Sequence, residues 1–288
     1  MKFLRLTCGL LLLALGAAHA QIKVEVTLAQ SQFLANETLM AAVRVSNLSG
    51  KSLTLGAELD WLKISVESRD GGIVSKLGEL PVQGEFTLAS SKAGIKRLDL
   101  APYFSLVQPG RYTVRATVRV PGWEQEFTSA PASFDIIQGA KLWEQEFGVP
   151  ATNPSALPPE MRKYVLQQAN YLKQLQLYVR VTDSAGSKTY SVRSVGRVVS
   201  FSQPESQVDA ASRLHILWQN GARAFAYRVV NPAGEVTVQQ TYDYTTTRPK
   251  LRLDESGKII VTGGARRLTR EDLPATAEAA TPKPQSLK

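Results

Sequence analysis

Cysteine is almost absent from this 288-residue chain, which holds one cysteine, Cys8, and two histidines. Cys8 lies inside an apolar run from Leu6 to Ala18 near the amino terminus. Removal of the segment up to Ala20 leaves a mature chain with no cysteine. Disulfides, thiolate zinc sites and cysteine nucleophiles are then excluded, so an apolar core alone must stabilise the fold.

The first twenty residues have the features of a secretory signal peptide. Lys2 and Arg5 precede the apolar run, and Ala18 and Ala20 place small residues at the two positions that a signal peptidase recognises. We therefore expect residues 1–20 to be removed and the protein to be exported to the periplasm or the extracellular space. No later apolar run approaches the length of a membrane-spanning helix, so no transmembrane segment is expected.

An excess of acidic residues is also absent. Without Lys2 and Arg5, the 34 basic residues become 32 against 25 acidic ones, a formal charge of +7. Such a balance suits an acidic polysaccharide or an anionic lipid surface, although many exported proteins are basic without such a partner. Nothing in the sequence predicts a nucleic-acid partner.

Motifs for catalysis or cofactor binding are missing as well. The sequence has no nucleophile elbow, no phosphate-binding glycine loop, no dinucleotide fingerprint and no run of alternating acidic ligands. His215, the one histidine after the signal segment, lies between Leu214 and Ile216 in an alternating strand, which favours a packing role. No catalytic residue, cofactor or metal site is predicted, because a zinc site with one histidine and no cysteine would be unusual.

What the sequence does hold is short runs of alternating apolar and polar residues over residues 21–138, which predict a β-sandwich. The clearest run is GRYTVRATVRV, residues 110–120. Its apolar side chains share one face and predict core positions: Tyr112, Val114, Ala116, Val118 and Val120. Its arginines share the opposite face: Arg111, Arg115 and Arg119.

This region resembles the immunoglobulin-like and fibronectin type III-like sandwiches of bacterial surface and secreted proteins. The resemblance rests on ANETLMAAVRVSNLSG and on the spacing of Leu106, Pro109 and Tyr112, which is similar to a tyrosine corner. It implies a spacer, adhesion or docking module and transfers no catalytic residue. The arginine stripe Arg111, Arg115 and Arg119 is a candidate site for an anionic polymer, with a solvated sheet face as the alternative.

Residues 139–175 are predicted to form a linker followed by a short helix. GVPATNPSALPPE is rich in proline and small polar residues, which marks a domain boundary. In EMRKYVLQQANYLKQL, the residues Met161, Val165, Ala169 and Leu172 fall near one helical face.

An internal sequence similarity predicts a duplicated four-stranded antiparallel unit over residues 176–267. Pro204 and Asp209 recur 45 residues later as Pro249 and Asp254, and Gly-Ala-Arg ends both stretches. The copies cover residues 176–223 and 224–267, and their length and strand content resemble β-propeller blades. The aspartates are expected to bind their own backbone two residues on, within turns.

Two blades are too few for a closed propeller. Either the two units face each other in one compact monomer, which we favour, or several chains pool their blades in a homo-oligomer. Residues 268–288 have the composition of a disordered tail.

Aromatic residues in the second unit are further candidates for ligand contact, because exposed aromatic faces bind sugars. The candidates are Trp218, Tyr242 and Tyr244. The sequence thus predicts a mainly β, exported, non-catalytic protein for binding, adhesion or assembly at the cell envelope or outside it. Its partner is an acidic polysaccharide or an envelope protein, and the alternative is an accessory or catalytic component of carbohydrate degradation.

Overall fold

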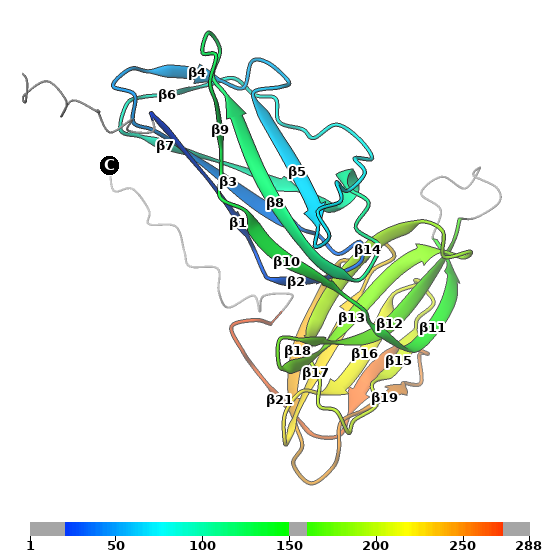
Figure 1. The fold of residues 1–288 in the computed structure, drawn as a ribbon. Coiled ribbons are helices and arrows are strands. Elements are labelled where there is room, and N and C mark those ends of the chain that lie inside the picture. Colours follow the sequence, from blue (N-terminus) through cyan, green and yellow to red (C-terminus); the bar gives the residue numbers. More distant parts are fainter. Residues whose placement is uncertain (1–20, 150–159, 273–288) are drawn as a thin grey trace, which may run out of the picture.

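The computed structural model describes residues 21–149 and 160–272 (Figure 1). The predicted signal peptide and most of the predicted tail lie outside these residues. The regular secondary structure of the described residues is β-strand, apart from one short 3-10 helix, η1, at Ala101–Tyr103. The mainly β class predicted from the sequence is therefore confirmed.

The first ten strands form the N-terminal region. Their bounds are β1 (Ile22–Leu28), β2 (Gln32–Leu34), β3 (Met40–Asn47), β4 (Leu53–Leu55), β5 (Leu62–Ser68), β6 (Phe86–Leu88), β7 (Ala93–Asp99), β8 (Gly110–Arg119), β9 (Glu126–Thr128) and β10 (Ala132–Ile137). One sheet has the order β1-β3-β7, and the other has the order β2-β10-β8-β5 with β9 also paired to β8. A small third sheet joins β4 to β6.

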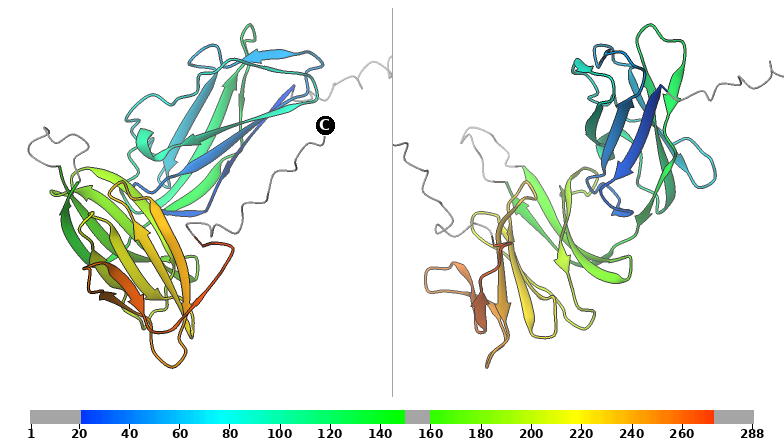
Figure 2. Two further views of the ribbon diagram at one scale, coloured as in Figure 1. Left: turned by 180° about the vertical axis from the view of Figure 1, so that it is seen from behind. Right: turned by 90° about the vertical axis from the view of Figure 1, so that its left-hand side faces the viewer.

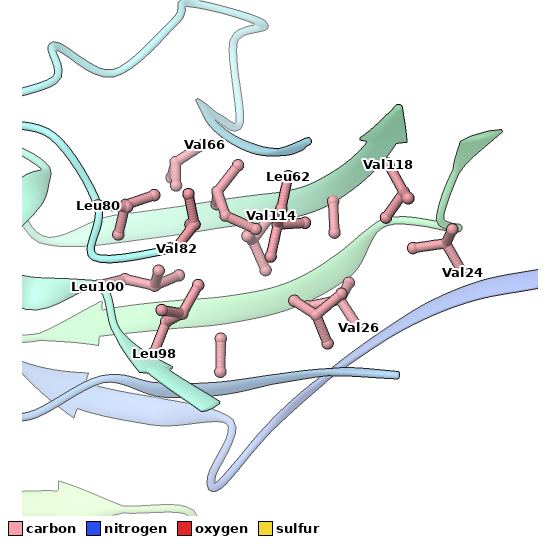
Figure 3. Close-up of a cluster of buried hydrophobic side chains, with 14 of the residues drawn as sticks. Val24, Val26, Leu62, Val66, Leu80, Val82, Leu98, Leu100, Val114 and Val118 are labelled. Atoms are coloured by element: carbon pink, nitrogen blue, oxygen red, sulfur yellow. The ribbon is translucent and has the colours of Figure 1, made fainter. Parts of the chain in front are cut away.

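The two larger sheets of the N-terminal region enclose one apolar core. Strand β8 alternates as the sequence predicts, with Val114, Ala116 and Val118 fully buried. Figure 3 shows Val114 and Val118 from β8 among side chains from other strands and from a loop that contributes Leu80 and Val82. The Tyr112 hydroxyl donates to the Gln108 carbonyl at 2.7 Å, so this tyrosine ties the start of β8 to the preceding loop.

The remaining strands form the C-terminal region. Their bounds are β11 (Ala140–Gly148), β12 (Met161–Tyr171), β13 (Gln174–Asp183), β14 (Thr189–Arg197), β15 (Glu205–Val208), β16 (Leu214–Gln219), β17 (Ala224–Val230), β18 (Val236–Asp243), β19 (Lys250–Leu253), β20 (Ile259–Thr262) and β21 (Ala265–Arg267). They make a sheet β11-β12-β13-β14, a sheet β15-β16-β17-β18-β21 and a separate hairpin β19-β20.

The five-stranded sheet of the C-terminal region is covered on both faces. Leu214, Ile216 and Trp218 pack toward the four-stranded sheet, where they meet Tyr164 and Leu166 of β12. The alternate residues of β16 and β17 pack instead toward the β19-β20 hairpin, as the second apolar cluster shows: Leu217, Phe225, Tyr227, Val229, Leu251 and Ile259. This double coverage explains why all six residues of β16 are buried.

The prediction of a short helix within residues 139–175 is wrong, because Met161–Tyr171 form strand β12 between β11 and β13. The four residues that suggested a helical face do not share an environment, since Met161 and Leu172 are exposed whereas Ala169 is buried. The burial of Tyr164 and Leu166 shows the two-residue period of a strand instead. Ten registered pairs with β13 outweigh the weak local preference for a helix.

The predicted duplicated unit does not form two blades. The first stretch, 176–223, supplies β13 and β14 to the four-stranded sheet but β15 and β16 to the five-stranded sheet. The second stretch adds β17, β18 and β21 to the five-stranded sheet, and β19 and β20 pair only with each other. The two sheets do close on each other within one chain, but they do not divide along the copies.

The internal sequence similarity instead corresponds to a hairpin turn that occurs twice. The Asp209 carboxylate accepts hydrogen bonds from the backbone N–H of Ala211 and Arg213, at 3.0 and 2.8 Å. Asp254 accepts the equivalent bonds from Ser256 and Lys258, both at 2.9 Å. This is the turn role predicted for the two aspartates, and it accounts for their recurrence without a ligand.

The two regions meet where β2 and β10 approach the outer face of the four-stranded sheet (Figures 1 and 2). Leu34 of β2 packs there against Tyr178 of β13 in a small buried cluster. The Leu172 N–H donates to the Gln32 side chain at 2.7 Å, and the Arg180 guanidinium donates to the Ala35 carbonyl at 3.1 Å. These contacts position the β12–β13 turn beside the N-terminal region.

In the described residues, no helix is long and apolar enough to cross a bilayer.

Candidate functional site

The three arginines of the predicted stripe lie on one exposed face of β8, but each faces a carboxylate. Arg111 pairs with Asp135 at 2.9 Å, across the strand pair formed with β10. Arg115 donates to both oxygens of Glu67 at 2.8 Å, and Arg119 pairs with Asp60. The hydrogen bond with Arg111 holds the pKa of the Asp135 carboxyl below its usual range. The stripe therefore carries little net positive charge for an anionic polymer.

The predicted aromatic residues do not form a common surface. Trp218 is 1% exposed and lies in the core, where its indole N–H donates to the Arg197 carbonyl at 2.7 Å. Tyr242 is half-buried against Tyr227, with ring centroids 6.4 Å apart. Tyr244 is exposed, but it lies beside the guanidinium of Arg223. None of these three residues is in the walls of the depressions formed by residues 170–176 and 197–201.

A groove does form at the β12–β13 turn, next to the contact between the two regions. Two adjoining depressions of about 410 and 560 Å³ share Lys173 and Gln174 in their walls. Together they are lined by residues 170–176 and 197–201, and we call them the joint groove. A third depression of about 300 Å³ on the N-terminal region shares Leu172 with it.

Two cations in the joint groove differ from the arginine stripe. Lys173 and Arg197 are both exposed on its wall. Within residues 21–149 and 160–272, no carboxylate lies within 4 Å of either side chain. These two charges are available to an anionic ligand, because their interaction with a ligand would not compete with an existing ion pair.

The remaining groove residues supply apolar and hydrogen-bonding surface. Phe201 is 78% exposed, which is unusual for so large an apolar side chain. Asn170, Gln174 and Gln176 contribute amide groups that both donate and accept. Sequence patterns missed Phe201, since it belongs to no alternating strand. The available signal is that it stands alone between two serines in the turn-rich segment before Pro204.

A strained turn forms one wall of the joint groove, and a buried tryptophan supports the other wall. Leu172 is the first of two residues between the paired Tyr171 and Gln174, and its φ of 53° is one that glycine favours in such turns. On the other wall, the Trp218 indole bonds to the Arg197 backbone and packs under Gly196, at which an added Cβ would lie 3.3 Å from the ring. Strained positions of this kind cluster at binding sites.

A cluster of polar side chains is buried between the five-stranded sheet and the β19-β20 hairpin. The His215 ring lies between Asp209 and Tyr227, with Nε2 3.0 Å from an Asp209 carboxylate oxygen and Nδ1 2.7 Å from the Tyr227 hydroxyl. Because an ionised carboxylate only accepts, Nε2–H donates to Asp209 and Nδ1 accepts from Tyr227. The connectivity resembles a catalytic relay, but His215 and Tyr227 are 4% and 7% exposed beneath the β19-β20 hairpin. We interpret the cluster as a structural network.

This network makes a prediction for the dependence of stability on pH. Burial lowers the pKa of the His215 imidazole below 6.5, against the opposing effect of its hydrogen bond to Asp209. As the pH falls through about 6.5, the unfolded chain binds a proton before the folded chain does. The free energy of unfolding is therefore expected to fall as the pH is lowered from 7 to 5, as measured by urea denaturation.

The matched variant His215→Gln can donate to Asp209 and accept from Tyr227 without titrating, so its unfolding free energy should lose that part of the pH dependence. Glu37 acts in the opposite direction, because burial raises the pKa of its carboxyl above 4.5 and its protonation at low pH then favours the folded state. Equal slopes for the wild type and the glutamine variant between pH 7 and 5 would show that His215 is not the responsible group.

No cluster of three or more histidine, cysteine, aspartate or glutamate side chains with metal-binding geometry occurs in the described part of the chain. No family model matches the chain, and no curated protein matches it. Among solved structures, the sporulation control protein Spo0M from Bacillus subtilis is similar with a TM-score of 0.30 and 10% identity, over 59% of this chain and 82% of that chain. A likeness at this level carries no argument about function.

Proposed function

We propose that this protein is an exported, non-catalytic binding protein and that it holds an acidic glycan in the joint groove. The observation that carries the proposal is the combination, in one groove, of two cations with no carboxylate within 4 Å among the described residues, an exposed aromatic ring and three amide side chains. The export that the first twenty residues predict supports this function, because acidic polysaccharides are abundant outside the cytoplasm.

The chemistry of an acidic sugar chain suits these groups. Carboxylate or sulfate groups would bind Lys173 and Arg197 through charge-assisted hydrogen bonds. The apolar face of a sugar ring would lie on Phe201, since exposed aromatic rings bind sugars through their faces. Sugar hydroxyls both donate and accept, as do the amides of Gln174 and Gln176.

The N-terminal region would serve as a spacer or docking module of immunoglobulin-like type. Two sheets around one core, antiparallel except for the β2–β10 pair, and the bond from the Tyr112 hydroxyl to the Gln108 carbonyl support that assignment. Its contacts at Gln32 and Ala35 support the β12–β13 turn that forms the groove. In this proposal the N-terminal region orients the site and attaches it to an envelope structure.

The experiment that tests the function is calorimetric titration of the mature protein with a defined uronate oligomer and with an uncharged oligosaccharide of equal length. The uronate oligomer should bind at least about tenfold more tightly, and its affinity should fall as salt is raised, because the added contacts are ionic. Equal affinities for the two oligomers, or no binding of either, would refute an acidic-glycan function.

A further inference from the structure

The depression of about 300 Å³ on the N-terminal region adjoins the joint groove at Leu172, which lies in the wall of both cavities. The Leu172 side chain is 60% exposed between them. The remaining walls of this depression belong to the N-terminal region, where Ser31, Gln32 and Ser133 contribute polar side chains. We call this cavity the N-terminal depression. A ligand that crosses Leu172 therefore contacts both regions of the protein.

Gln32 holds the two cavities in a fixed relation. Its side-chain oxygen accepts a hydrogen bond from the Leu172 N–H at 2.7 Å, and the same residue lines the N-terminal depression. A second bond joins the two regions nearby, from the Arg180 guanidinium to the Ala35 carbonyl at 3.1 Å. Because these bonds set the spacing of the cavities before a ligand arrives, an extended ligand pays less ordering entropy when it binds across them.

The N-terminal depression differs from the joint groove in its charge. Its charged side chains are Arg111 and Asp135, which pair with each other at 2.9 Å. The hydrogen bond with Arg111 keeps the pKa of the Asp135 carboxyl below its usual range, so this carboxylate is ionised at neutral pH. An acidic group of a ligand would meet the Asp135 charge here and would have to compete for Arg111. The charge balance of this cavity therefore favours an uncharged group.

Hydroxyl groups are the polar surface that the N-terminal depression offers. Ser31 and Ser133 are both exposed in its walls. Serine hydroxyls donate and accept hydrogen bonds, as sugar hydroxyls do. The exposed Leu172 side chain supplies apolar surface at the crossing between the two cavities. These groups suit an uncharged sugar unit next to the acidic units in the joint groove.

We propose that one glycan chain spans both regions of the protein. Its acidic units bind Lys173 and Arg197 in the joint groove, the chain crosses Leu172, and an uncharged sugar unit occupies the N-terminal depression. This inference rests on the proposed glycan function and adds to it that the ligand contains uncharged as well as acidic units. The N-terminal region then binds ligand directly, in addition to its role in supporting the β12–β13 turn.

The test compares two oligomers on the full mature chain: a disaccharide of one uronate and one uncharged sugar, and a hexasaccharide in which these units alternate. The variant Ser133→Tyr fills the N-terminal depression from an exposed strand position. It should weaken hexasaccharide binding at least about tenfold and leave disaccharide binding unchanged, because only the longer chain extends past Leu172. Calorimetric titration measures the hexasaccharide, and titration of amide chemical shifts measures the disaccharide.

The control variant is Thr117→Tyr. Thr117 lies on the same outward face of β8 as Arg111 but outside the walls of the N-terminal depression, so this change adds the same ring without blocking the path. The control ligand is a uniform uronate hexasaccharide. Ser133→Tyr should leave its affinity unchanged, because its carboxylates are kept out of the depression by Asp135.

A measurement on the wild type complements the variants. In the chain labelled with nitrogen-15, the alternating hexasaccharide should shift the amide signals of Ser31 and Ser133 together with those of Lys173 and Ser200. Shifts confined to residues 170–176 and 197–201, with no loss of affinity in Ser133→Tyr, would overturn the spanning chain and leave the glycan function intact. Equal weakening of both hexasaccharides by Ser133→Tyr would overturn the assignment of an uncharged unit. Binding of none of the oligomers would refute the glycan function and this inference with it.

Discussion

Replacing Trp218 with alanine is expected to lower the free energy of unfolding by about 3–5 kcal/mol, the usual cost of truncating a large buried aromatic side chain. Trp218 is 1% exposed and packs between the two sheets of the C-terminal region. Its loss would also leave the Arg197 carbonyl without its indole donor. Urea denaturation followed by circular dichroism measures this change.

A tryptophan in a looser setting provides the matched control. Trp123 is only partly buried, at the border of the N-terminal core, so Trp123→Ala should cost clearly less than Trp218→Ala. A loss below about 1 kcal/mol for Trp218→Ala would mean that the two sheets do not share the packed core described for the C-terminal region.

Replacing Lys173 and Arg197 together with glutamine is expected to weaken binding of a uronate oligomer about a hundredfold. Hydrogen bonds to charged groups contribute about 1.5–3 kcal/mol each, and the double variant removes the two charges that face the ligand. Both side chains are exposed and neither has a carboxylate partner in the described part of the chain, so the fold should be unaffected. Calorimetric titration measures the affinity.

The thermal unfolding temperature of the double variant serves as its control and should match that of the wild type. Unchanged affinity in a variant that remains folded would place the ligand elsewhere on the protein.

Local patterns predicted strands well where one face of the strand meets a core. The alternation of GRYTVRATVRV correctly identified the buried face of β8, because burial on one side imposes a two-residue period. The Asp209 and Asp254 turns were predictable for a similar reason, since the bonds that define them join residues two positions apart in the chain.

Patterns failed where the structure depends on distant partners. Residues 161–171 have apolar spacing that fits both a helix and a strand, and pairing with β11 and β13 decides between them. The repeated turns at Asp209 and Asp254 suggested a repeated unit, but the choice of sheet for each hairpin depends on long-range packing. The arginine stripe was visible in the sequence, whereas its partners Glu67 and Asp60 lie more than forty residues away.

The joint groove could not be predicted because two separate segments form it. Residues 170–176 and 197–201 come together only when β13 and β14 pair. The exposure of Phe201 also depends on the surrounding fold and not on any local period. A site assembled in this way leaves only weak signals in a single sequence.

The most direct test of glycan binding in the joint groove compares two sets of arginine and lysine variants in the same uronate titration. If the glycan binds in the joint groove, Lys173→Gln with Arg197→Gln loses about a hundredfold in affinity. The triple variant Arg111→Gln, Arg115→Gln and Arg119→Gln should change affinity by less than about threefold, because those arginines are already paired with carboxylates. The opposite order of effects would show that the glycan binds along β8 and would contradict the assignment of the joint groove.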